Sequence, residues 1–295
     1  MKPGSRIAAL ATAVVAAALT ACQPTVQPDP QALDLADGPI AGKFVWHDLI
    51  TDDPRAAQRF YGGLFGWTFE RSNRPGGDAP YVLIRSEGRY IGGIVDVEDP
   101  RDGDYTRWLG YLSVPDVDAA VGATQRAGGE ALAAPVNLGN ALRVAAVRDP
   151  QGAILGFVHS EAGDPADRPL RPGRVAWNEL LAADDEAAAA FYAGVAGYEA
   201  EAIERRGGRY IVLQASGQAR AGIQQRPASG AQPLWLTHFA VEDPAAAAAQ
   251  ARALGGRVLL APTPEVRDGA MAIVEDPNGA VFALTHLPTL QEGAP

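Results

Sequence analysis

Hydrophobic and polar residues follow each other along the chain in a pattern that predicts the same short series of elements four times. Each series begins with an apolar run of strand length, continues into a helix that starts at an aspartate, and ends with three short strands. In the first series, the run Phe44–Ile50 leads to Asp53 and Pro54, an N-cap and a first-turn proline. The helix that follows carries apolar residues at helical spacing and stops at Gly66. The pattern therefore predicts a β-α-β-β-β unit that occurs four times.

The four units form two copies of a longer repeat. With one constant offset, Trp46, Phe60-Tyr61 and Gly66 recur as Trp177, Phe191-Tyr192 and Gly197. With a slightly smaller offset, Trp108, Asp116, Gly128-Gly129, Pro135, Asp149-Pro150 and His159 recur as Trp235, Asp243, Gly255-Gly256, Pro262, Asp276-Pro277 and His286. Self-similarity at a fixed offset indicates repeated structure. We therefore expect two homologous domains, at residues 43–160 and 174–287, joined by a charged, proline-containing linker at 161–173 and followed by a short tail at 288–295.

The segment before Lys43 differs in composition from the repeat. Lys2 and Arg6 precede an apolar run from Ile7 to Leu19, which is shorter than the roughly 20 helical residues that cross a bilayer. Residues 1–21 therefore fit a secretory signal peptide. The segment ends in Leu-Thr-Ala-Cys, which resembles the lipobox of bacterial lipoproteins and places the only cysteine, Cys22, where that motif is lipidated. The alternative is an ordinary signal peptide whose cleavage site includes a cysteine.

The segment after this cysteine is rich in Pro, Asp and Gln, and residues 22–42 are expected to form a flexible tether. The lipoprotein resemblance implies a protein of the cell envelope that contacts the lipid bilayer through acylated Cys22. In a Gram-negative cell it would sit on the outer membrane and face the periplasm.

Composition excludes several classes of protein. Acidic residues outnumber basic ones by 35 to 25, which gives a net charge of −10 and argues against a nucleic-acid-binding protein, because such a protein needs a basic surface. The chain is 47% hydrophobic and 20% charged, as expected for globular domains. A single cysteine excludes a scaffold built on disulfides.

The motifs resemble those of the vicinal oxygen chelate superfamily, also called the glyoxalase and bleomycin-resistance fold. The resemblance is carried by WHDLITDDPRAAQRFYGGLFGW at Trp46–Trp67, by WLGYLSVPDVDAAVGATQRAGG at Trp108–Gly129 and by DPQG at Asp149–Gly152, and all three recur in the second half. It implies an α+β fold of two tandem domains, each a pair of βαβββ units that curl eight strands around an open cleft. Members include metal-dependent isomerases, epimerases, dioxygenases and thiol transferases, and also metal-free proteins that sequester drugs.

The resemblance also implies where a metal would bind. In metal-using members, one ligand lies on the strand before the helical Phe-Tyr pair, one lies on the strand before the Asp that caps the second helix, and one lies on the strand after the DPxG turn. At the matching positions this chain has Trp46, Leu109 and Gly156 in the first domain and Trp177, Leu236 and Ala283 in the second. None of these side chains ligates a divalent ion. We therefore expect no metal and no other cofactor, unless a shift of one residue in the strand register turns His47 inward.

Strand periodicity predicts which side chains line each cleft instead. In each domain an indole, a carboxylate and a Tyr or His lie at alternate strand positions whose side chains are expected to point into the cleft. The candidate ligand-binding residues are therefore Trp46, Asp48, Tyr111, Trp177, Glu179 and His238. An indole face beside a carboxylate suits a small aromatic or cationic molecule. Glu179 and His238 also form a candidate carboxylate–imidazole pair for general-base catalysis.

The leading hypothesis is a membrane-anchored, metal-free protein that binds a small molecule in its clefts. A metal-dependent lyase, isomerase or dioxygenase is the enzymatic alternative, and the sequence favours binding over catalysis. The third hypothesis is an envelope interaction module whose clefts are filled by Trp46 and Trp177. The sequence leaves the oligomeric state open. It is compatible with a monomer whose two domains pair within the chain.

Overall fold

The computed structural model describes residues 30–72, 81–97, 106–139, 141–205, 208–226 and 232–286. The expected signal peptide, the lipidation site Cys22 and the tail at 288–295 lie outside these ranges. Within them, no helix is both long enough and apolar enough to span a membrane.

The first half of the chain forms one mixed sheet from two βαβββ units. Its elements are β1 (Phe44–Thr51), α3 (Pro54–Phe65), β2 (Thr68–Ser72), β3 (Tyr81–Ser86), β4 (Arg89–Asp96), β5 (Arg107–Ser113), α4 (Val117–Arg126), β6 (Glu130–Ala131), β7 (Val136–Leu138), β8 (Leu142–Arg148) and β9 (Ile154–Ser160). The strand order is β2-β3-β4-β1-β5-β9-β8-β6, with β7 paired to β8. The central strands β1 and β5 are antiparallel and join the two units.

The second half repeats this arrangement. Its elements are β10 (Val175–Ala182), α5 (Asp185–Ala196), β11 (Glu199–Arg205), β12 (Gly208–Ala215), β13 (Gln218–Gln225), β14 (Leu234–Val241), α6 (Pro244–Ala253), β15 (Arg257–Leu260), the 3-10 turn η1 (Arg267–Gly269), β16 (Met271–Glu275) and β17 (Val281–His286). The strand order is β11-β12-β13-β10-β14-β17-β16-β15. The expected fold of two tandem domains, each a pair of βαβββ units, is confirmed.

The local signals in the sequence act as predicted. The side chains of Asp53, Asp116 and Asp243 each accept a backbone N–H in the first turn of their helices, which satisfies donors that the helix itself leaves unpaired. Gly66 ends α3 at a φ of 69°, a left-handed conformation that glycine adopts without strain.

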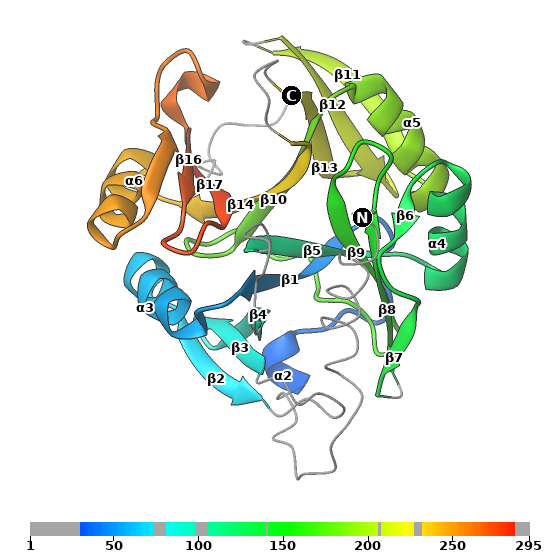
Figure 1. The fold of residues 1–295 in the computed structure, drawn as a ribbon, viewed down its shortest axis with the longest axis horizontal. Coiled ribbons are helices and arrows are strands. Elements are labelled where there is room, and N and C mark those ends of the chain that lie inside the picture. Colours follow the sequence, from blue (N-terminus) through cyan, green and yellow to red (C-terminus); the bar gives the residue numbers. More distant parts are fainter. Residues whose placement is uncertain are drawn as a thin grey trace, which may run out of the picture.

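The two domains share their hydrophobic cores. One core is formed mainly by the second and third units, with Leu112, Phe157 and Leu180, and is joined by Trp235 from the first strand of the fourth unit. The other is formed mainly by the first and fourth units, and in it Tyr61 and Trp67, together with Trp108 from the first strand of the second unit, pack with Phe239 and Phe282. Figure 1 shows the result, with α3 beside α6 on one side of the molecule and α4 beside α5 on the other. Each unit therefore packs its outer face against a unit of the other domain.

Part of the expected tether belongs to the folded body. Residues 30–42 include the short helix α2 (Pro30–Leu33), and Ala32 is buried against the first sheet. Asp34 forms ion pairs with Arg89 and Arg168, and the backbone N–H of Ile40 donates to Asp164 at 2.6 Å. Long-range ion pairs thus hold a segment whose composition alone predicts flexibility. Within the described residues, the segment 30–42 therefore packs against the folded body.

Candidate functional site in the two clefts

The inner face of each sheet carries alternate residues, as strand periodicity predicts. Ile50, Leu109 and Tyr111 belong to the cluster on the inner face of the first sheet. Their neighbours Leu49 and Trp108 belong to the core on the outer face. The same alternation turns His47 outward, so the register shift that would bring it into the cleft is not observed.

The three positions at which the resemblance implies metal ligands lie on adjacent strands of the first sheet. Trp46 is opposite Tyr111, Asp48 is opposite Leu109, and Tyr111 lies beside Gly156. The Tyr111 ring fills the space over Gly156, where a Cβ atom would lie 2.3 Å from the ring. A carboxylate side chain at this position would collide with Tyr111. The first cleft therefore does not fit a divalent metal ion at these positions.

A hydrogen-bonded network closes the first cleft. The carboxylate of Asp48 is buried and accepts hydrogen bonds from the Trp46 indole at 2.9 Å and from the Tyr81 hydroxyl at 2.8 Å. The sequence did not single out Tyr81. The signal that could have found it is Gly93, which pairs with Asp48 across the sheet and leaves room for the Tyr81 hydroxyl. The Trp46 indole and the Asp48 carboxylate are thus hydrogen-bonded to each other within the cleft.

The second cleft holds a different polar group. Glu179 is buried, forms an ion pair with Arg267, and lies 3.9 Å from His238 Nε2. His238 Nδ1 is 2.8 Å from the Thr285 hydroxyl, while its Nε2 has no hydrogen-bond partner among the described residues. Burial lowers the pKa of His238 to about 4, Arg267 lowers it further, and Glu179 opposes the shift. His238 is therefore neutral near pH 7.

The predicted pair of Glu179 and His238 is thus brought together, and Arg267 joins it unexpectedly. Arg267 lies in η1, where Arg267 and Asp268 have φ values of 49° and 53°. This left-handed conformation costs roughly 1–2 kcal/mol for each non-glycine residue. No motif marks this loop in the sequence. The ion pair with Glu179 holds the strained turn over the cleft.

The indole of the second cleft is not bound to a carboxylate. Trp177 is partly exposed and donates to the Tyr210 hydroxyl at 2.8 Å. Burial and the nearby Glu179 raise the pKa of Tyr210 above its usual value, so its hydroxyl stays protonated. Trp177 and His238 are opposite each other on β10 and β14. They form one continuous wall with Tyr210.

The two clefts differ in how much apolar surface they leave open. Among the described residues, the inner cluster of the first sheet contains eleven buried hydrophobic side chains, including Ala32 from α2. The corresponding cluster of the second sheet contains three. Six further apolar side chains of the second cluster are only partly buried: Leu181, Leu234, Leu260, Val266, Ile273 and Val281. The first cluster also has six partly buried apolar side chains, Trp46 among them. The first cleft is therefore packed with more fully buried side chains, whereas most of the apolar lining of the second is only partly buried.

Comparison with known proteins agrees with this architecture. Residues 43–157 match the family described as the Glyoxalase/Bleomycin resistance protein/Dioxygenase superfamily, and residues 175–285 match the Glyoxalase-like domain. A protein of Mycobacterium tuberculosis named "Putative glyoxylase CFP32" is 34% identical over 81% of this chain and 92% of its own length. The chain belongs to the glyoxalase superfamily. The anthracycline biosynthesis protein DnrV of Streptomyces peucetius is 30% identical over 86% of this chain and 95% of its own length.

Solved structures share the fold at low sequence identity. The Mn(II)-bound glyoxalase from Novosphingobium aromaticivorans superposes with a TM-score of 0.57 at 15% identity and covers 84% of this chain and 83% of its own. Homoprotocatechuate 2,3-dioxygenase from B. fuscum gives a TM-score of 0.56 at 14% identity over 85% of this chain and 72% of its own. In the part of this glyoxalase-superfamily chain that the structure describes, no group of three His, Cys, Asp or Glu residues could hold a metal ion.

Proposed function

We propose that this glyoxalase-superfamily protein is a lipid-anchored envelope protein that binds a small aromatic molecule in its second cleft without a divalent metal. The observation that carries the proposal is the partly exposed apolar lining of the second cleft beside Trp177. Exposed apolar surface next to a few converging polar groups is typical of small-molecule sites.

The charges in the second cleft favour an aromatic ligand over a cationic one. Arg267 already neutralises Glu179, and both side chains are largely removed from solvent. A cationic ligand would have to displace Arg267 and leave a buried guanidinium without its partner, which is costly. An uncharged aromatic molecule can instead stack on Trp177 and cover the apolar side chains.

The anchor is supported by the lipobox-like segment at Cys22 and by the short distance to the folded body. Eight residue steps separate Cys22 from Pro30. An extended chain of this length spans at most about 29 Å, so an acylated Cys22 would keep the body next to the bilayer. In cell fractionation, we expect the wild-type protein in the membrane fraction and Cys22→Ser in the soluble fraction. Equal membrane retention of both would refute the anchor.

The ligand site is tested by titrating a panel of small aromatic molecules into the purified full-length protein and measuring binding by calorimetry. Trp177→Ala should weaken the best ligand at least tenfold because it removes the stacking surface, whereas Trp177→Phe should retain most of the affinity. The matched control is Trp46→Ala, at the equivalent position of the first cleft. It should lower stability by on the order of 2 kcal/mol and leave binding unchanged.

Two outcomes would contradict this proposal. If no aromatic molecule binds, or if Trp177→Ala only destabilises the protein, the second cleft is a packing feature and the protein is better described as an interaction module. The name of the mycobacterial relative favours the enzymatic alternative. Metal content distinguishes it: a stoichiometric metal that survives dialysis, together with turnover lost in Glu179→Gln, would establish a metal-dependent enzyme.

A further inference from the structure

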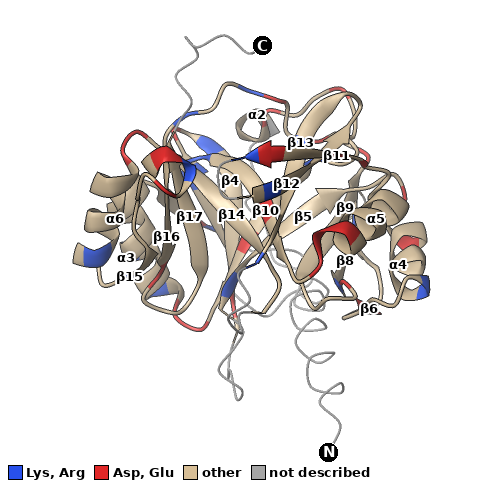
Figure 2. Cartoon of the chain, turned by 90° about the horizontal axis from the view of Figure 1, so that it is seen from above, with Lys and Arg blue, Asp and Glu red and all other residues tan. Residues whose placement is uncertain are grey.

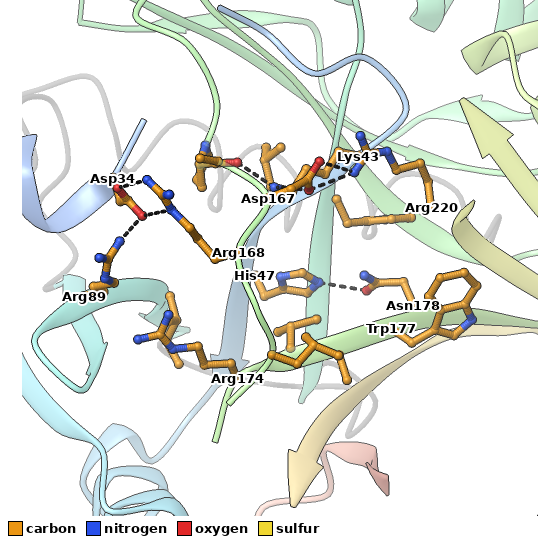
Figure 3. A pocket seen from close by; sticks show the side chains of 18 of the residues that line it. Asp34, Lys43, His47, Arg89, Asp167, Arg168, Arg174, Trp177, Asn178 and Arg220 are labelled. Carbon is orange, nitrogen blue, oxygen red and sulfur yellow. Dashed lines mark hydrogen bonds and ion pairs between the residues drawn. The ribbon is translucent and has the colours of Figure 1, made fainter. Parts of the chain in front are cut away.

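A cavity of about 280 Å³ lies between the two domains, and its lining includes Trp177 but neither Asp48 nor Glu179. Its walls come from the starts of β1 and β10, from β4 and β13, and from the linker segment 165–170. Two of the side chains that line it, His47 and Asn178, occupy equivalent positions in the two repeats. His47 Nε2 lies 2.8 Å from Asn178 Oδ1 (Figure 3). The cavity therefore lies where the two domains meet around their common axis of symmetry.

Basic side chains dominate the lining of this cavity. Among the described residues, five cations line it: Lys43, Arg89, Arg168, Arg174 and Arg220. The carboxylates in the same lining are Asp34 and Asp167. Figure 3 shows that each carboxylate is shared by two cations, Asp34 by Arg89 and Arg168, and Asp167 by Lys43 and Arg220. The lining thus keeps an excess of three positive charges, although the whole chain has a net charge of −10.

The rest of the molecule does not share this excess. Figure 2 shows acidic and basic residues interspersed over helices, strands and loops. His47 adds no charge to the cavity, because burial lowers its pKa to about 4 and leaves the ring neutral near pH 7. The positive charge is therefore a local property of this cavity.

Arg174 is the cation with the weakest compensation. The carboxylate that pairs with it, Glu87, is 3.4 Å away and 56% exposed, so solvent screens the pair. The Arg174 side chain itself is only 17% exposed, and its Nε is buried with no hydrogen-bond partner among the described residues. Burial lowers the pKa of Arg174, and the neighbouring Arg89 and Arg171 add to this effect. A guanidinium held in positive surroundings with an unpaired donor is a preformed site for an anion.

We propose that this cavity binds the phosphate group of a small phosphate ester or of a phospholipid headgroup, with Arg174 as its principal contact. Guanidinium groups match phosphate oxygens with paired hydrogen bonds. A phosphate monoester carries about −1.5 to −2 charges near pH 7, which offsets most of the excess in the lining. The volume lies just below the roughly 300 Å³ at which typical ligand pockets begin, so it suits only a small group such as a phosphate. Trp177 lines both this cavity and the aromatic site proposed above, so the two sites share one side chain, but Arg174 belongs to this cavity and takes no part in the aromatic site.

The test is calorimetric titration of the full chain carrying Cys22→Ser with sodium phosphate and with glycerol 3-phosphate, at constant ionic strength. The informative variant is Arg174→Gln, which should weaken binding at least tenfold. Arg171→Gln is the matched control, because Arg171 loses the same charge, is 63% exposed and lies outside the lining. It should change binding less than threefold. Circular dichroism and the midpoint of thermal unfolding establish that both variants are folded.

A second arm of the test distinguishes the source of the phosphate. The same proteins are sedimented with vesicles of phosphatidylglycerol and with vesicles of phosphatidylcholine. Retention on phosphatidylglycerol that is lost in Arg174→Gln but kept in Arg171→Gln identifies a lipid headgroup. Binding of glycerol 3-phosphate without vesicle retention identifies a soluble ester. The proposal is overturned if neither is bound, or if Arg174→Gln binds as well as the control.

Discussion

At the scale of single residues, small side chains decide what the clefts can hold. Gly93 pairs with Asp48 across the first sheet, and Gly222 pairs with Glu179 across the second. A Cβ atom at either glycine would lie within 2 Å of a hydroxyl oxygen, that of Tyr81 or of Tyr210. Glycine is therefore required where Tyr81 and Tyr210 cross the sheet. In the first domain this arrangement directs a hydroxyl onto Asp48 and completes a closed network. In the second domain Arg267 takes the carboxylate, and Tyr210 holds Trp177 instead.

Two buried histidines make the stability of the protein depend on pH. Burial lowers the pKa of His47 and of His238 to about 4, below the value of 6.5 expected when they are exposed. Between these values the unfolded chain binds more protons than the folded one. The free energy of unfolding therefore falls as the pH drops from about 6.5 towards 4, by up to about 3 kcal/mol for each histidine.

Urea unfolding at several pH values between 7.5 and 5 tests this dependence. His238→Gln should unfold more easily than wild type at pH 7.5, because the hydrogen bond with Thr285 is altered. It should lose less stability than wild type as the pH falls, because one titrating group is gone. Equal losses in the two proteins would show that His238 does not contribute.

At the scale of elements, the turns that mark the family connect the two domains. Asp149 of the DPQG turn accepts a hydrogen bond from the Tyr192 hydroxyl of α5, and Gln151 caps the backbone that leads into the same helix. Asp276 of the DPNG turn accepts from the Tyr61 hydroxyl of α3, and Asn278 binds Thr51 at the end of β1. Motifs that predict turns within one domain therefore join each domain to the other.

Whether the sequence predicts an element depends on how far apart in the sequence the residues that stabilise it lie. Helices α3, α4 and α6 begin at the predicted aspartates, because a cap involves neighbours in the sequence. Helix α2 and the strained turn η1 were not predicted. Each is held by partners distant in the sequence: Arg89 and Arg168 pair with Asp34, which follows α2, and Glu179 pairs with Arg267 in η1. Such contacts leave no local pattern.

At the scale of the whole molecule, the shared cores make the two domains one folding unit. The core that contains Leu112 and Phe157 of the first domain is completed by Leu180 and Trp235 of the second. Separation would expose apolar surface on both sides, at a cost of about 25 cal/mol for each Å². The tandem chain therefore supplies within one molecule a pairing that separate domains would have to make by association.

Division of the chain within the linker tests this interdependence. We expect fragments 23–172 and 173–295 to aggregate or self-associate when expressed alone, and to recover a native-like circular dichroism spectrum when refolded together. Size-exclusion chromatography with light scattering measures the masses, and the full chain should unfold in a single transition. Two monomeric fragments that unfold cooperatively by themselves would contradict a shared core.

The sequence by itself determined the number of units, the residues at which the helices start, and which side chains along each strand point into the cleft or away from it. It also determined that Trp46, Leu109 and Gly156 have no metal-ligating side chains. All of these depend on spacing along the chain or on the chemistry of single side chains. Tertiary structure alone decided that Tyr81 closes the first cleft, that Arg267 reaches Glu179, and that five cations surround one cavity. Packing and Coulomb energies depend on distances in space, and folding brings together residues that lie far apart in the sequence.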